Sequence, residues 1–547
     1  MLPDADTYDG LRSRFAWRLG RHYNIAADVC DRWARAEPER DAILHRHEDG
    51  RIETYSYGRL MSCSNRLANA LKAHGVARGD RVALLLPQMP ETAISHLAIY
   101  KLAAVAVPLA ALFGVEALRY RLANSGAKAV LTDRAGLAKL AEIRSDLPDL
   151  RLLVSTDGPE DGAVGFKGLI DGGSESLEVE DTLADDPAMM IYTSGTTGPP
   201  KGALHGHRVL PGHLPGIGMV HEFMPLEGDL FWTPADWAWA GGLLNALLPA
   251  LHFGVPIVSY RFDKFDPERA FALMAELGVR NAFIPPTALK MLRTVEAPLE
   301  KHDLKLRTIG SAGEALGRET FDWAESCLKL SVNEFYGQTE CNAVLASCAA
   351  LGVSRAGAIG KPVPGHEVSI VDNSGRELGD GELGQIAVRS PDPVMFLEYW
   401  GRPDATREKF AGGFLLTGDQ GYRDEDGYFH FVGRDDDVIT SAGYRIGPAE
   451  IEDCLISHPA VALAAAVGKP DPVRTEIVKA YIVPKEGVSP SPELEDEIRE
   501  FVRNRLSAHE YPREIAFVDS MPMTTTGKVI RRVLRDRARI EAGTDEE

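Results

Sequence analysis

Cysteine is scarce in this chain, and each one stands alone. Six occur in 547 residues, with no C-x-x-C pair: Cys30, Cys63, Cys327, Cys341, Cys348 and Cys454. So few in so long a chain indicate reduced thiols, and their spacing fits no zinc-binding pattern. We therefore expect neither a disulfide framework nor a structural zinc ion.

An excess of basic residues and long apolar runs are also lacking. The net charge is −20 and the pI is about 5.3, whereas a nucleic-acid scaffold needs a basic face. The longest apolar stretches, such as 103–113, are shorter than the ~20 residues of a membrane span. The N-terminus, MLPDADTYDG, is typical of neither a signal peptide nor an Arg-rich transit peptide. These absences favour a soluble cytoplasmic protein with no nucleic-acid partner.

What the sequence does contain, over residues 79–133, is an alternation of two apolar patterns. Strand-like RVALLL, AVPL and AKAVLTD are separated by segments with helical apolar spacing near 90–105 and 115–123. Strand-like segments recur around 187–192, 254–260 and 280–284. Such alternation predicts parallel sheets covered by helices, the α/β class.

The pattern of apolar and turn-forming residues changes from about Gly357 onward. Short apolar segments between Gly, Asp and Pro turns predict antiparallel β structure there. A charged segment, Gly433–Val438, then precedes the last ~110 residues, which contain strand-like AAAVG and VKAYIVP and a helical pattern over 492–506. On the residues alone this segment is either a surface loop or a link to a small α+β domain.

The run Tyr192–Gly202, YTSGTTGPPKG, is the most informative string in the chain. It holds three glycines, four Ser or Thr hydroxyls and Lys201 in eleven residues, directly after an apolar run. Glycines let backbone N–H groups turn toward a ligand, hydroxyls add donors and the lysine adds positive charge, which suits phosphate. The spacing is not that of the Walker motif. The alternative, a flexible surface turn, does not account for the ordered string.

A second string, Asn333–Glu340 (NEFYGQTE), combines an aromatic ring with hydrogen-bonding side chains and a carboxylate. Tyr336 is suited to stack on a purine, Thr339 to bind a phosphate oxygen and Glu340 to hold Mg²⁺. Taken alone, the string equally fits a strand end and a turn.

Together these strings resemble the acyl-adenylate-forming superfamily, which includes acyl-CoA synthetases, adenylation domains of peptide synthetases and luciferases. The resemblance spans roughly residues 25–540, with the signatures in the expected order. It implies a phosphate-binding loop that comprises Thr193, Ser194, Gly195, Thr196, Thr197, Gly198 and Lys201. It also implies an adenine and Mg²⁺ segment that comprises Glu334, Phe335, Tyr336, Gly337, Gln338, Thr339 and Glu340.

The resemblance assigns further roles along the chain. The segment Ser311–Ala315 is similar to the loop that packs on adenine, through Gly313, Glu314 and Ala315; an alanine stands where a proline is common. Asp419, in a TGD string that we expect at a strand end, is identified as the ribose ligand, with Arg434 as its second partner.

The C-terminal part carries the second most specific string, PMTTTGK, which ends at Lys528. Lys528 matches the superfamily's catalytic lysine, whose ammonium bridges the acyl carboxylate and the α-phosphate. Asp436 matches the hinge residue. This implies an N-terminal domain over 1–433, a hinge over 434–440 and a mobile domain over 441–547. The arginines that follow Lys528 are interpreted as a solvated helix face.

A closer likeness, through WTPADWAW (232–239) and Tyr511–Arg513, is to acetyl- and medium-chain acyl-CoA synthetases. It implies that Arg474, Arg503, Tyr511 and Arg513 face the CoA nucleotide. The superfamily resemblance itself implies that the loop of Ala442, Gly443, Tyr444 and Arg445 presents its backbone to the pantetheine arm of CoA, with Arg445 near the phosphates. A proline usual before the tyrosine is absent from SAHEYPRE.

The acyl pocket is assigned to Trp239 and Gly337. Dedicated acetyl-CoA synthetases carry a tryptophan at the position of Gly337, and we expect glycine to leave that volume open for acids larger than acetate.

The sequence therefore predicts an ATP-dependent acyl-CoA synthetase with catalytic residues Lys528, Lys201 and Glu340, and with ATP, Mg²⁺ and CoA as its ligands. A carboxylate attacks the α-phosphate, diphosphate leaves, and the CoA thiol attacks the acyl-adenylate. Two alternatives remain, an enzyme that loads a carrier protein and a non-catalytic nucleotide-binding regulator.

Overall fold

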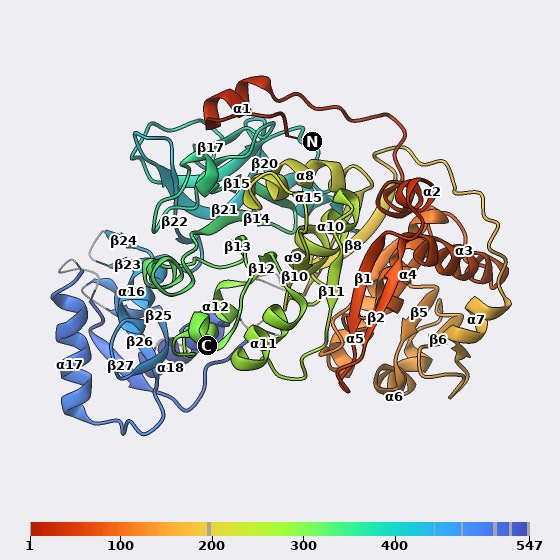
Figure 1. The fold of residues 1–547 in the computed structure, drawn as a ribbon. Helices are drawn as coiled ribbons and strands as arrows, with labels where there is room; N and C mark the ends of the chain where they lie inside the picture. The colour runs from red at the N-terminus through yellow and green to blue at the C-terminus, as the bar shows by residue number, and fades with distance from the viewer. Residues whose placement is uncertain are drawn as a thin grey trace.

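The computed structural model describes residues 2–193, 199–441, 444–471, 474–506, 511–524 and 528–543, without the side chains of Tyr444 and Arg445. In these residues the strands form four sheets, three in the large N-terminal part and one in the small C-terminal domain (Figure 1). The expected α/β class with a β-rich subdomain and a small α+β domain is confirmed.

The first sheet contains the predicted strand–helix alternation. Its order is β19 (Glu398–Tyr399), β9 (Lys201–Gly206), β8 (Pro187–Thr193), β4 (Val105–Pro108), β3 (Arg81–Leu85), β5 (Ala129–Thr132), β6 (Leu152–Ser155) and β7 (Val164–Gly165). β3 pairs in parallel with both β4 and β5. Its crossover helices are α4 (Pro90–Lys101), α5 (Val115–Ser125), α6 (Arg134–Ile143) and α7 (Phe166–Gly172).

The second sheet is also largely parallel. Its order is β16 (Lys361–Pro362), β15 (Cys341–Ala346), β14 (Val332–Gln338), β13 (Thr308–Ser311), β12 (Asn281–Phe283), β10 (Phe231–Trp232), β11 (Ile257–Ser259), β1 (Asp41–Arg46) and β2 (Ile52–Ser56). Helices that connect or flank it are α8 (Val209–Val220), α10 (Leu248–Phe253), α11 (Pro267–Leu277), α12 (Pro286–Leu292), α13 (Pro298–Lys301) and α14 (Arg318–Trp323).

Local sequence sets where these helices begin and end. The Asp266 side chain accepts from the backbone N–H of Arg269, Pro267 occupies the first helical position of α11, and Gly278 ends the helix with a left-handed backbone. Such a cap, an early proline and a terminal glycine each satisfy or remove an unpaired backbone group.

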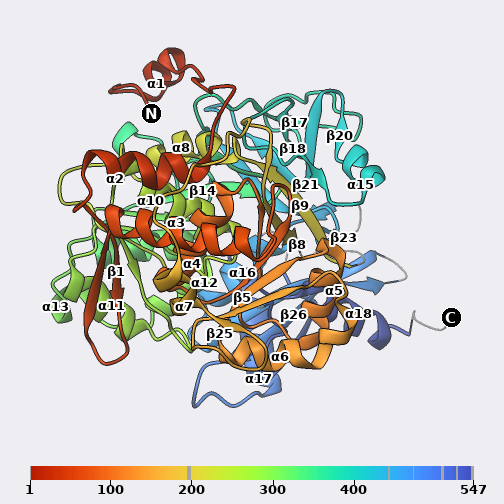
Figure 2. The ribbon, with the colours of Figure 1, turned by 90° about the vertical axis from the view of Figure 1, so that its right-hand side faces the viewer.

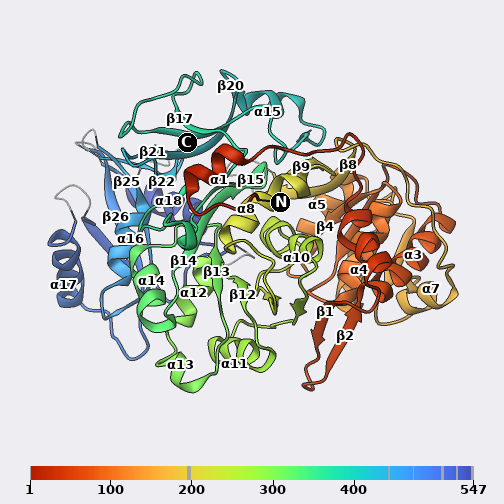
Figure 3. The same cartoon turned by 45° about the horizontal axis from the view of Figure 1, so that its top comes forward.

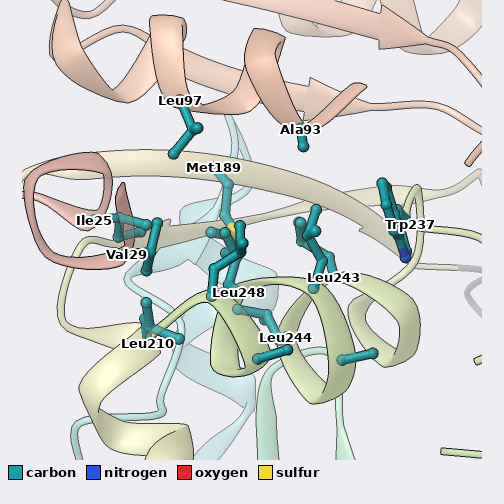
Figure 4. Close-up of a cluster of buried hydrophobic side chains, with 14 of the residues drawn as sticks. Ile25, Val29, Ala93, Leu97, Met189, Leu210, Trp237, Leu243, Leu244 and Leu248 are labelled. Atoms are coloured by element: carbon teal, nitrogen blue, oxygen red, sulfur yellow. The ribbon is translucent and has the colours of Figure 1, made fainter. Parts of the chain in front are cut away.

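The main core joins the two large sheets. α4 is almost entirely buried, with nearly every residue hidden from solvent. It is covered in turn by α3 (Tyr57–Ala73), which lies along it in Figure 2. Figure 4 shows Leu97 of α4, Met189 of β8 and Leu243 and Leu248 of the helical segment 240–253 pointing toward one another. Burial of this apolar surface is the main stabilising contribution to the fold.

The remaining two sheets are smaller. The β-rich subdomain contains β17 (Val368–Val371), β18 (Gly384–Arg389), β20 (Phe410–Ala411), β21 (Phe414–Arg423) and β22 (Phe429–Arg434), all antiparallel. The small domain contains β23 (Ile439–Ser441), β24 (Tyr444–Ile446), β25 (Val461–Asp471), β26 (Thr475–Pro484) and β27 (Glu514–Phe517). Its helices are α16 (Pro448–Ile456), α17 (Pro492–Arg503) and α18 (Arg531–Glu541).

The small domain packs beside α12 and α14, as Figure 3 shows from above. Within the described ranges, no helix is long and apolar enough to cross a bilayer.

Candidate active site

The phosphate-loop string connects two strands of the first sheet. β8 and β9 are antiparallel, with Thr193 opposite Lys201 in the register. Ser194, Gly195, Thr196, Thr197 and Gly198 lie outside the described residues. The Lys201 ammonium lies 5.0 Å from the centroid of the Tyr399 ring, over its face. A cation over an aromatic face is attracted by the ring quadrupole, so Tyr399 orients the lysine.

Tyr399 also joins Lys201 to Glu340. Its hydroxyl donates a hydrogen bond to Oε1 of the buried Glu340 carboxylate, which lies just after the turn at Thr339. This leaves Oε2 for another ligand. The sequence reasoning missed Tyr399 because the string LEYW matches no motif that would mark this tyrosine as part of a site.

Asp419 is held by two residues of the predicted adenine segment. Tyr336 Oη and Gln338 Nε2 each donate to Asp419 Oδ2 at 2.6 Å, which leaves Oδ1 without a described protein partner. Burial raises the pKa of Asp419, and the Arg434 guanidinium opposes that shift. Arg434 is the register partner of Asp419 across β21 and β22. The expectation that Asp419 ends a strand is wrong, because β21 continues to Arg423.

The predicted adenine loop runs from β13 into α14. Gly313 has φ of +104° and Gly317 has φ of +80°, backbone conformations that suit glycine. The Thr287 hydroxyl donates to Glu314 Oε1 at 2.9 Å. Glu334 stabilises this loop from the protein interior, since its Oε1 accepts a hydrogen bond from the Leu316 backbone N–H at 3.1 Å. Burial raises the pKa of the Glu334 carboxyl to about 7.

Two members of the predicted adenine segment face the protein interior. Phe335 is 2% exposed and packs against Phe283, with ring centroids 5.6 Å apart. Glu334 is 9% exposed and bound to the loop. Both side chains support the local fold, whereas the neighbouring Tyr336 and Gln338 reach Asp419.

Lys528 crosses from the small domain to this loop. Its Nζ lies 3.6 Å from the point where a Cβ on Gly313 would stand, so the lysine packs directly against this glycine. The side chain is exposed, and desolvation by the surrounding protein lowers the pKa of the ammonium, which the Glu314 and Asp419 carboxylates oppose. The lysine thus lies against the predicted adenine loop, where the charges of Glu314 and Asp419 act on it. Thr525, Thr526 and Gly527 lie outside the described residues.

The chain changes sheets around Asp436, between β22 and β23. Arg434 Nε lies 3.4 Å from Asp436 Oδ1, and Arg535 of α18 donates to the Asp436 carbonyl at 2.5 Å and to the Asp437 carboxylate. The expectation of a merely solvated arginine face on α18 is wrong here. Arg531 joins this network through Asp437, with Nη1 at 3.9 Å from Oδ2, and also pairs with Glu452, with Nη2 at 2.6 Å from Oε2.

The predicted CoA-nucleotide residues are gathered only in part. The guanidinium carbons of Arg503 and Arg513 lie 5.8 and 5.1 Å from the Tyr511 ring centroid. Arg474 lies in the turn before β26, and no contact in the described ranges joins it to that cluster. Ala442 and Gly443, with the side chains of Tyr444 and Arg445, lie outside the description.

The acyl-pocket prediction needs a correction at Gly337. A Cβ there would lie 2.4 Å from Asn342 Cα and 2.5 Å from the Ala343 nitrogen, both backbone atoms. Glycine at 337 therefore permits a close crossing of β14 and β15 and does not mark open volume. Trp239 is half-buried, with its ring centroid 5.6 Å from that of Phe113 in an edge-on contact.

Comparisons with known proteins agree with this arrangement. The model of the AMP-binding enzyme family matches residues 30–400, and that of the AMP-binding enzyme C-terminal domain matches residues 450–528. The acetyl-coenzyme A synthetase of Bacillus subtilis is 35% identical over 94% of this chain and 90% of its own length. The mitochondrial acyl-coenzyme A synthetase ACSM4 of Mus musculus is 35% identical over 95% of this chain and 91% of its own.

Among solved structures, the anthranilate CoA ligase AuaEII in complex with anthranoyl-AMP superposes with a TM-score of 0.88. It is 29% identical and covers 96% of this chain and 99% of its own. With family models matched on both sides of Asp436 and relatives matched over nearly the whole chain, the protein belongs to the AMP-binding enzyme family.

Proposed function

We propose that this protein is an AMP-forming acyl-CoA synthetase, which joins a carboxylic acid to CoA through an acyl-adenylate. The observation that carries the proposal is that Lys528 of the small domain lies against Gly313 of the large domain, where the charges of Glu314 and Asp419 act on it. A protein that only bound a nucleotide would not need a lysine from the far domain. The relatives' names, with acids as different as acetate and anthranilate, support the reaction class and leave the acid open.

We assign Asp419 to the ribose hydroxyls and Lys528 to the reacting centre. Oδ1 of Asp419 accepts from the ribose while Tyr336 and Gln338 hold Oδ2. As the acid's oxygen attacks the α-phosphate, negative charge shifts from the carboxylate to the phosphoryl oxygens. A fixed ammonium beside both stabilises that redistribution without reorganising. Diphosphate then leaves.

The donor set fits Mg²⁺ at Glu340. Proteins usually bind Mg²⁺ through one or two carboxylates together with phosphate oxygens of the substrate. The buried Glu340 would supply such a carboxylate oxygen through Oε2, because Tyr399 bonds to Oε1. When bound there, Mg²⁺ supplies positive charge to the diphosphate. Lys201, oriented by Tyr399, adds a second charge on the same side.

The second half-reaction uses CoA, and Arg503, Tyr511 and Arg513 are our candidates for its nucleotide. An aromatic ring between two guanidinium groups presents stacking and positive charge together, which suits an adenine nucleotide. Transfer to a carrier protein is disfavoured, because such a partner would not need this cluster.

Asp419→Asn should weaken ATP binding. The amide keeps the shape, but the ribose loses a charged acceptor, and a hydrogen bond to a charged group contributes roughly 1.5–3 kcal/mol. The expected result is an ATP Kd raised by about 10- to 100-fold. Asp426→Asn, in the β21–β22 turn, is the matched control and should leave the Kd unchanged. An unchanged Kd in both variants removes Asp419 from the nucleotide site.

The acid is proposed to be a short- or medium-chain, branched or aromatic carboxylic acid, with Trp239 as one wall of its pocket. A panel from acetate to octanoate with branched and aromatic members, followed by thioester formation, tests this. Trp239→Ala should move the optimum to larger acids, with each methylene contributing about 1–3 kcal/mol to discrimination.

Leu112→Ala, an exposed neighbour of Phe113, is the control for this panel. Wild-type preference for acetate, or an unchanged profile in a folded Trp239 variant, would contradict the assignment. Gly337→Trp is unsuitable, since the indole would have to displace backbone.

A further inference from the structure

Helix α14 of the large domain is capped by a residue of the small domain. The helix follows Gly317, which offers no side chain, and continues through a π-helical turn, Ala324–Leu328. The first N–H groups of a helix have no partner within it. Asp453 of α16 supplies one, since its Oδ2 accepts from the Arg318 backbone N–H at 3.1 Å, from 135 residues along the chain.

Gly317 makes this approach possible. With φ of +80°, its absent Cβ would stand 2.3 Å from Asp453 Oδ1, so any side chain there would push the carboxylate away. Burial raises the pKa of Asp453. The Lys290 ammonium of α12 and the backbone amides of Arg318 and Glu319 oppose that shift, and the Glu319 carboxylate adds to it. The carboxylate is thus enclosed by α12 and α14, with a cation and a helix N-terminus as its favourable partners.

The same loop contacts the small domain a second time. Gly313 receives Lys528, and four residues later Gly317 receives Asp453. Leu316, between them, is fixed by Glu334 from the interior of the large domain. This loop, bonded to the large domain at Leu316, therefore meets the small domain at two points, one beside the proposed nucleotide site and one at the helix cap.

We propose that Asp453 is a positioning residue that seats the small domain for adenylation, an inference that rests on the proposed function. Its hydrogen bond to α14 holds the orientation in which Lys528 reaches the adenine loop. If the small domain turns about Asp436 for thioester formation, this bond breaks. Asp453 then favours the first half-reaction at the expense of the second.

The test separates the half-reactions in Asp453→Ala, Asp453→Asn and the control Glu486→Ala, an exposed acid after β26. Carboxylate-dependent exchange of diphosphate into ATP measures adenylation. Thioester formation from ready-made acyl-adenylate and CoA measures the second step. Loss of a helix cap predicts exchange lowered by roughly 5- to 30-fold in Asp453→Ala. The second step should stay at the wild-type rate or above. Asparagine also caps helices, so Asp453→Asn should recover part of the exchange.

Three results would count against the proposal. Wild-type rates of both steps in Asp453→Ala, or equal loss of both with a lowered melting temperature, would leave Asp453 without a positioning role. The same follows if Glu486→Ala shows the same split. Failure of the wild-type protein to exchange diphosphate with any acid would instead refute the proposed function. The wild-type control therefore distinguishes the two failures.

Discussion

Lys528→Ala is expected to lose adenylation by on the order of 10²–10³-fold, the scale for removal of one preorganised donor. The lysine stands beside Gly313, where the charges of Glu314 and Asp419 act on it, and we propose that the acid and the α-phosphate react next to its ammonium. With ready-made acyl-adenylate and CoA, the same variant should still form thioester at a rate near that of the wild type. The two rates are measured by diphosphate exchange and by thioester absorbance.

Two further variants complete this experiment. Lys485→Ala, an exposed lysine of the small domain, should leave both rates unchanged. Asp436→Pro should show the reverse split, because proline fixes φ near −65° at the proposed hinge and prevents rotation. Equal loss of both half-reactions in the Lys528 and Asp436 variants, with folding intact, would mean that one fixed arrangement performs all the chemistry.

The folded protein should lose stability steeply between pH 6.5 and pH 5. Five buried histidines are held neutral by desolvation, which lowers their pKa from 6.5 to about 3 for His96, His205 and His221, and to about 4 for His207 and His213. In the unfolded chain each takes up a proton near pH 6.5. Their contribution is therefore fully present above that pH and is lost as the pH falls toward the folded values.

Buried acids work in the opposite direction. Burial raises the pKa of Asp236 to about 6 and that of Glu334 to about 7, so the folded state binds these protons before the unfolded state does. The histidines outnumber them, and we expect the unfolded state to hold about two or three more protons near pH 5.5. Each proton corresponds to about 1.4 kcal/mol per pH unit.

Chemical denaturation at half-unit pH steps measures this slope. His96→Gln should reduce it by up to one proton, since His96 bonds only through Nδ1, 2.9 Å from the Tyr100 hydroxyl. His74→Gln, exposed at the end of α3, should leave the slope unchanged. Stability that is constant or higher at pH 5 would show that the buried histidines do not control acid unfolding.

The periodicity of apolar residues correctly predicted those strands and helices that depend on neighbouring residues in the sequence. The strands at 81–86 and 187–192 and the helices that begin at Pro90 and Pro492 are confirmed, because apolar spacing and early prolines act within a few residues. The position of Asp419 inside β21 was missed, since the following glycine and charges suggested a turn. Pairing with β22 keeps that strand extended.

The site could be predicted as a set of strings but not as a network. No spacing rule relates Tyr399 to Glu340, 59 residues apart, or Asp453 to Arg318. The interpretation of Gly337 was wrong for a similar reason. A glycine permits both an open volume and a close backbone approach, and only the distance to Asn342 distinguishes them.

The path of one oxygen atom tests the central claim most directly. The enzyme is given ATP, CoA and a carboxylic acid labelled with ¹⁸O in its carboxylate, and the AMP is analysed by mass spectrometry. If an acyl-adenylate forms, the attacking oxygen stays on phosphorus when the CoA thiol displaces AMP. The account predicts one labelled oxygen transferred to AMP per thioester formed, and none to diphosphate. Label in inorganic phosphate with release of ADP, or thioester formed with unlabelled AMP, would contradict it.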